Sequence, residues 1–120
     1  MTFTVDSYSL NVLRFSEESE PVGAEWYAWE GENVVVKRFT YGLKRIWRLT
    51  CVEEGVSWSS SVAKYLQGKM STGDTVSFAA DEGDRYSLPA TYTYVASLWI
   101  EYEPTGTRNI RRFTVTLREK

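Results

Sequence analysis

Two long alternating segments near the C-terminal end of the chain give the clearest structural signal. From Tyr92 to Tyr102 the even positions are apolar or aromatic, and from Phe113 to Leu117 apolar residues alternate with threonines. A polar turn at 103–107 separates the two segments. Alternation with a period of two is the spacing of a half-buried β-strand. The pattern predicts a long antiparallel hairpin over about 91–118. The even face of its first strand is the default core face, although the sequence alone does not fix which face is buried.

A different spacing follows the middle of the chain and predicts one helix. Its apolar positions recur at steps of four and are Trp58, Val62, Leu66 and Met70. Ser57 or Ser59 can cap the first turn, and Gly68 weakens the end. We therefore expect a helix at about 59–68 that presents an apolar stripe to a sheet.

The remaining periodic segments are short strands. Residues 3–15 predict one kinked strand or two short ones, and 76–88 predict a short hairpin. The β-branched segment 33–41 and the alternating segment 46–52 predict two strands joined by a turn at 42–44. Strands dominate and the helix is solitary, so we expect a mainly β fold: an antiparallel β-sandwich or split barrel with one flanking helix. The length of 120 residues is typical of a single domain.

The segment 16–32 breaks these patterns and is predicted to be an arm or long loop. It contains Pro21 and several glutamates, yet also Trp26, Tyr27 and Trp29. A long loop without periodicity in a compact domain is commonly functional or mobile. Two interpretations follow, because indole rings left in water are costly. The rings either fold back on the core of the chain or pack on a neighbouring subunit or a ligand.

The composition is that of a globular protein, with 42% apolar, 15% aromatic and 25% charged residues. A net charge of −2 makes no strong case for binding nucleic acid or an anionic membrane. No apolar run is long enough for a membrane span, and the N-terminus lacks a signal-peptide pattern. We expect a soluble protein that is cytoplasmic during synthesis. The single cysteine, Cys51, cannot form an internal disulfide and is expected to be a small core residue.

The charges are unevenly distributed along the chain. Between Glu17 and Glu32 there are six glutamates and no basic residue, whereas the last thirteen residues carry five basic residues and one acidic residue. The three arginines nearest the turn of the long hairpin are Arg108, Arg111 and Arg112. These segments are either a solvated loop and a solvated strand face, or two patches that meet between copies of the protein.

Residues suited to catalysis are scarce. Histidine is absent, which removes the commonest general base, and no glycine-rich phosphate loop occurs. Paired carboxylates could catalyse glycoside hydrolysis, and three carboxylates in one turn could bind calcium. These residues are equally well explained as the polar residues that turns ordinarily contain. These groups are Glu53 with Glu54, Asp81 with Glu82 and Asp84, and Glu101 with Glu103. We expect no enzyme activity and no cofactor, and assign no catalytic or metal-binding residue; a small carboxylate-based enzyme is the third hypothesis.

The high aromatic content supports a second hypothesis, a carbohydrate-binding β-sandwich module. Aromatic faces stack on sugar rings, and the chain has five tryptophans and eight tyrosines. Tyr92, Tyr94 and Tyr102 lie on the predicted core face, where burial is expected. The candidates for glycan binding are then Trp26, Trp29, Trp58 and Trp99.

The order of elements resembles a family of viral structural proteins. A helix, a short hairpin and two long strands follow the segment Gly42-Leu43-Lys44-Arg45-Ile46-Trp47-Arg48-Leu49-Thr50-Cys51. The second long strand ends with Phe113-Thr114-Val115-Thr116-Leu117-Arg118-Glu119. Over 33–119 this layout is similar to the tail-tube and distal-tail (baseplate hub) proteins of tailed bacteriophages. The resemblance implies a β-sandwich or split barrel with one flanking helix, whose long strands join into a ring. It also implies that 16–31 contacts neighbouring subunits, and it carries no catalytic signature.

The leading hypothesis is therefore a non-enzymatic structural protein that self-associates into a ring and works with other assembly proteins, as a component of a phage, prophage or archaeal virus tail. Its location would then be the virion. The residues expected at the interface are Trp26, Tyr27, Trp29, Arg108, Arg111 and Arg112.

Overall fold

The computed structural model describes residues 1–103 and 110–120, apart from the side chains at 24, 38–41 and 103. Its strands form one antiparallel sheet of seven, in the order β2-β1-β5-β6-β7-β4-β3. The strands are β1 (Thr2–Val5), β2 (Tyr8–Leu10), β3 (Val12–Glu30), β4 (Asn33–Glu54), β5 (Val76–Asp81), β6 (Ser87–Glu103) and β7 (Ile110–Glu119). The predicted fold class, mainly β with one flanking helix, is confirmed.

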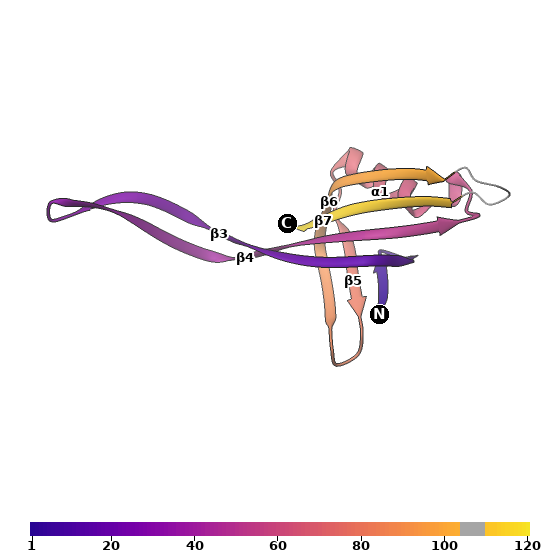
Figure 1. The fold of residues 1–120 in the computed structure, drawn as a ribbon, viewed down its shortest axis with the longest axis horizontal. Coiled ribbons are helices and arrows are strands. Elements are labelled where there is room, and N and C mark those ends of the chain that lie inside the picture. The colour runs from indigo at the N-terminus through magenta and orange to yellow at the C-terminus, as the bar shows by residue number, and fades with distance from the viewer. Residues whose placement is uncertain (104–109) are drawn as a thin grey trace.

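The sheet folds over on itself because β6 belongs to both of its halves. The first part of β6 pairs with β5, and the second part pairs with β7. Figure 1 shows β6 bending from one half-sheet into the other. The two halves enclose a common core with the helix, as in a sandwich. The largest fully buried side chains are Trp47, Phe78, Phe113, Leu49, Leu66 and Leu117.

A β-bulge in β6 changes which residues face this core. The register against β7 shifts between Val95 and Ser97, which leaves Ala96 as an extra residue. Just before the bulge the odd residues Thr93 and Val95 are buried, and after it the even residues Leu98 and Ile100 pack on the core. Nearer the start of β6 the even residues Leu88 and Ala90 are buried, and a register shift against β5 separates Ala90 from Thr93. The prediction of one continuous even core face is therefore wrong at Tyr92 and Tyr94. Tyr92 is 70% exposed, and at the strand end Tyr102 is 59% exposed.

The helix begins later than its spacing predicts. A 3₁₀ turn at Trp58–Ser60 precedes α1 (Val62–Thr72). Ser61 is the N-cap, because its hydroxyl accepts a hydrogen bond from the backbone N–H of Ala63 at 3.1 Å. At the other end Gly73 takes the left-handed conformation, with φ of 74°, that commonly ends helices. Ala63 and Leu66 supply the buried stripe, whereas Trp58 and Met70 lie at its exposed margins.

β4 is one strand of 22 residues, so the turn predicted at 42–44 is wrong. Gly42 lies opposite Val22 of β3, next to a register shift in the β3–β4 pair. The N-terminal residues form the expected two short strands, β1 and β2, followed by the start of β3. In the described part of the chain, no helix is long and apolar enough to cross a membrane.

Candidate functional site

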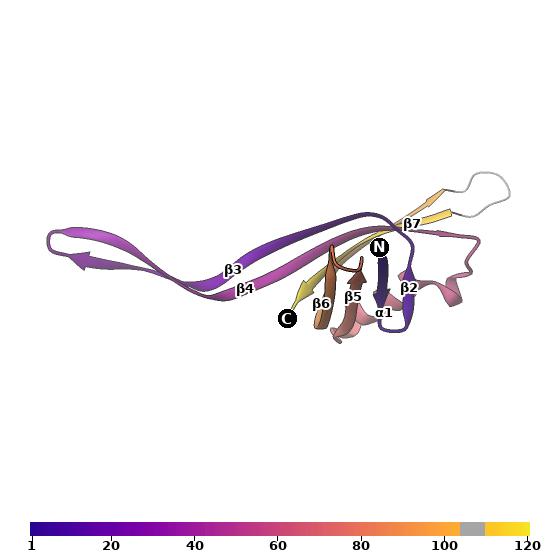
Figure 2. The same ribbon diagram turned by 90° about the horizontal axis from the view of Figure 1, so that it is seen from below.

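Strands β3 and β4 continue far beyond the sheet as a two-stranded arm. β7 pairs with β4 only from Ile46 opposite Arg118 to Glu54 opposite Ile110. From Ser19 opposite Arg45 to Glu30 opposite Asn33, β3 and β4 pair with each other alone. We call residues 19–45 the arm. It makes the molecule 73 Å long against 32 and 25 Å in the other directions, and both views show it leaving the body (Figures 1 and 2).

The segment predicted as an arm or long loop is thus regular strand instead of loop, and it ends in a tight turn. Its aromatic rings do not fold back on the core, so that interpretation is wrong. Tyr27 is 75% exposed and Trp29 is 74% exposed. Val36 lies opposite Tyr27 and Val34 lies opposite Trp29, and both valines are more than half exposed. Because directly opposed residues share a face of a sheet, these four side chains form one apolar surface, the arm-tip patch.

The opposite face of the arm is less apolar. Trp26 lies there, opposite Lys37, and is 48% exposed. Ala28 and Val35 form the next pair on this face and are half-buried. Glu30 lies beyond this pair, and its carboxylate binds the Lys37 ammonium. The structure thus places Trp26 on the reverse side from Tyr27 and Trp29.

The arm-tip patch includes two residues that sequence reasoning missed. Val34 and Val36 belong to a β-branched run that resembles a core strand when it is considered alone. Their exposure follows from their pairing with Trp29 and Tyr27 at the far end of the hairpin. The feature of the sequence that could have indicated this pairing is Gly31, at the turn with Glu32. Gly31 has a φ of 62°, a conformation that favours glycine. A hairpin turn at that position brings the valines beside the aromatic residues.

At the base of the arm, the acidic and basic segments meet within one chain. Arg118 binds Glu20 at 2.6 Å, and Arg48 binds Glu18 at 2.9 Å. These pairs are exposed, so each contributes no more than about 1 kcal/mol. They nevertheless pair, within one chain, some of the acidic and basic residues that could have formed contacts between copies. The exposed aromatic residues that could form such contacts lie nearer the tip of the arm.

Of the three predicted interface arginines, the two that the structure describes, Arg111 and Arg112, do not form a surface with the aromatic residues of the arm. Arg111 is buried instead of being at an exposed interface: it is 9% exposed, and its guanidinium is 3.2 Å from the Glu53 carboxylate. The guanidinium also lies between the rings of Trp58 and Tyr102, 5.1 and 5.4 Å from their centroids. Arg112 is exposed on the outer face of β7. Arg108 lies outside the described residues.

The paired carboxylates have structural roles where they are described. Glu53 accepts hydrogen bonds from the Ser61 hydroxyl and the Ala63 N–H, at 3.0 and 3.2 Å, in addition to binding Arg111. Asp81 accepts from the Gly83 N–H in its turn. Glu101 accepts from the Trp99 indole at 2.8 Å. Among the described residues, no three His, Cys, Asp or Glu side chains are placed to hold a metal ion.

Cys51 is a core residue, as expected, and lies between the half-sheets with no exposed surface. Burial, with a contribution from the Glu53 charge, raises the pKa of its thiol to about 12. We expect the native protein to resist alkylation by iodoacetamide at pH 8 and to react fully in denaturant, because the thiolate is the reactive form. Mass spectrometry of both samples checks this prediction. Rapid alkylation of the folded protein would contradict the burial of Cys51.

Comparison of the sequence with models of known protein families and with curated proteins gave no match. The inference of function therefore rests on the surfaces of the molecule. The most prominent of these is the arm, which extends an exposed apolar patch far from the core.

Proposed function

We propose that the chain is a non-enzymatic structural protein that self-associates through its arm. The observation that carries this proposal is the arm-tip patch, in which Tyr27, Trp29, Val34 and Val36 are all at least half exposed. A two-stranded ribbon is marginally stable alone in water. Covering its apolar face on another molecule would remove this surface from water and fix the arm. Patches of this kind mark interaction sites in soluble proteins.

The contact that we propose is head-to-tail. In it the arm of one copy meets the body of the next, so the two contacting patches differ. Repeated contacts of this type produce a closed ring or an open filament. The ring is the form that we propose, in line with the resemblance to tail-tube and distal-tail proteins. The same resemblance supports a viral tail as the setting, with other tail proteins as further partners.

The carbohydrate-binding alternative is less well supported. Sugar stacking needs aromatic faces that share one platform, and the four candidate tryptophans do not provide one. Trp26 and Trp29 face opposite sides of the arm, Trp58 packs on Arg111, and Trp99 lies on the body in β6. Trp99 is 66% exposed, but its indole N–H is already bound by Glu101.

Removing the arm-tip rings tests the proposal. We expect the double variant Tyr27→Ala/Trp29→Ala to weaken self-association by about 30-fold or more, since buried aromatic anchors commonly contribute about 2 kcal/mol or more to an interface. Light scattering behind a sizing column, over a range of protein concentrations, measures the effect. Trp99→Ala is the matched control, because it removes an equally exposed indole from the body. A wild-type chain that stays at 13.8 kDa at every concentration, or a double variant that assembles like wild type, would refute the proposal.

A further inference from the structure

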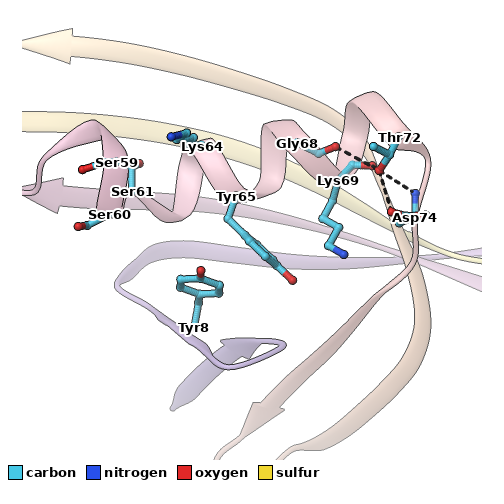
Figure 3. A pocket seen from close by; sticks show the side chains of 10 residues that line it. All are labelled: Tyr8, Ser59, Ser60, Ser61, Lys64, Tyr65, Gly68, Lys69, Thr72 and Asp74. Atoms are coloured by element: carbon cyan, nitrogen blue, oxygen red, sulfur yellow. Dashed lines mark hydrogen bonds between the residues drawn. The ribbon is translucent and has the colours of Figure 1, made fainter.

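A groove of about 410 Å³ lies along α1, between the helix and β2, on the body of the molecule (Figure 3). Its aromatic wall is formed by Tyr8 of β2 and Tyr65 of α1, whose ring centroids are 4.4 Å apart. Lys64 and Lys69 line it from the helix, and Asp74 lies at the end beyond the helix C-terminus. The groove therefore combines aromatic surface with two cationic side chains.

The acidic side chains that the structure describes around the groove do not pair with the two lysines, which are therefore available to bind an incoming carboxylate. Neither lysine forms an ion pair with an acidic side chain in the described part of the chain. Lys69 lies over the Tyr65 ring, with its ammonium 5.5 Å from the centroid. Asp74 is held by the Thr72 hydroxyl at 3.0 Å. A second carboxylate near the groove, Asp6, accepts hydrogen bonds from the Tyr65 hydroxyl and the Ser77 N–H.

The Tyr65–Asp6 hydrogen bond also fixes the aromatic wall. It is the largest cause that raises the pKa of Tyr65, to about 12. Like an ordinary tyrosine, Tyr65 is neutral at physiological pH. A neutral ring that is held in place is a suitable surface for an incoming aromatic side chain. The lysines provide charge on the same surface.

The arm tip carries the complementary chemistry. Trp29 presents an exposed indole, and Glu32 follows it in the turn with an exposed carboxylate. Glu32 forms no ion pair within the described residues, whereas Glu30 is bound to Lys37. Near its turn the arm thus offers the Trp29 ring and the Glu32 carboxylate, and the groove offers two aromatic rings and two ammonium groups.

We propose that the groove along α1 receives the arm tip of a second copy of this chain. In that contact the Trp29 indole packs against Tyr8 and Tyr65, and the Glu32 carboxylate pairs with Lys64 or Lys69. The arm extends away from its own body, so the occupant comes from another molecule (Figures 1 and 2). The inference rests on the proposed function and adds to it the surface on which the arm docks.

Charge reversal on each side of the contact tests this docking. We expect Lys64→Glu/Lys69→Glu to weaken self-association by at least about tenfold, and Glu32→Lys to do the same, because each places like charges together. Combining Glu32→Lys with the lysine reversals should restore assembly towards the wild-type level. Lys64→Glu alone serves as a second variant, because Lys64 is exposed and its replacement leaves the Tyr65 contact intact. The matched control is Arg85→Glu/Lys120→Glu, which makes the same charge change at exposed sites away from the groove.

A zero-length carbodiimide crosslink gives an independent readout. In a mixture of isotopically light and heavy protein, we expect mixed-label peptides that join Glu32 to Lys64 or Lys69.

If Tyr27→Ala/Trp29→Ala weakens assembly while lysine reversal does not, the arm docks elsewhere. The groove is then refuted as the docking site, and the proposed function stands. If neither change weakens assembly, both are refuted. Equal weakening by the control pair, or no recovery in the combined variant, would also overturn the groove.

Discussion

Replacing Trp47 by alanine is expected to lower the free energy of unfolding by about 3–5 kcal/mol, the usual cost of removing a large aromatic side chain from a core. Trp47 is the largest fully buried side chain and has no exposed surface. Its ring is 5.4 Å from that of Phe78, which lies in the other half of the folded sheet. Its indole N–H donates to Glu17 at 2.9 Å. The change would therefore open a cavity between the half-sheets and remove a link to β3.

Urea denaturation followed by circular dichroism measures this loss, since fluorescence would change with the tryptophan itself. Small domains have a total stability of about 5–15 kcal/mol, so the expected loss is a large fraction of the total and should lower the urea midpoint clearly. Trp99→Ala is again the control, because Trp99 is mostly exposed and should change stability by less than about 0.5 kcal/mol, as is usual at such sites. Equal losses in the two variants would show that the half-sheets do not close on Trp47.

The second large effect is expected at the buried ion pair between Arg111 and Glu53. We expect Arg111→Met to lower stability by about 3–5 kcal/mol, because it leaves the Glu53 carboxylate buried without its cation. Glu53 cannot simply turn to water, since it also accepts hydrogen bonds from Ser61 and Ala63 at the start of α1. The helix N-terminus and β7 are thus linked through one carboxylate.

A double-mutant cycle separates the ion pair from the rest of this site. Glu53→Gln keeps an oxygen for Ser61 and Ala63 but removes the charge. The double variant Glu53→Gln/Arg111→Met should therefore be less destabilised than the sum of the two single variants, as measured by thermal and urea unfolding. Strict additivity would mean that the charges of Glu53 and Arg111 do not interact in the folded protein.

Sequence periodicity predicted the elements whose partners lie nearby along the chain. The long hairpin and the short one are present, and the helix exists with shifted ends. The predicted core face of β6 was wrong at Tyr92 and Tyr94, because these residues continue the even apolar pattern of Leu98 and Ile100 across the bulge. A single extra residue reverses the inward side, and no local pattern marks it.

The arm was only partly predictable for a similar reason. Pro21 and the glutamates of β3 are typical of a loop when considered locally, but a strand at the edge of a sheet tolerates both. Its regular structure comes from β4, which returns along its whole length. The aromatic residues of the arm were recognised as unusual because nothing in their own segment could bury them. The burial of Arg111 was not recognisable, since Glu53, Trp58 and Tyr102 surround it only after folding.

The position of β4 has a mechanical consequence. This strand runs without interruption from the arm into the body, where β3 and β7 flank it on either side. A pulling force at the tip would act along the strand axis and load the β4–β7 ladder in shear. Under shear many hydrogen bonds share the load and must fail together, whereas under peeling they fail one at a time. The arm can therefore transmit tension into the body along a strand that is paired on both sides.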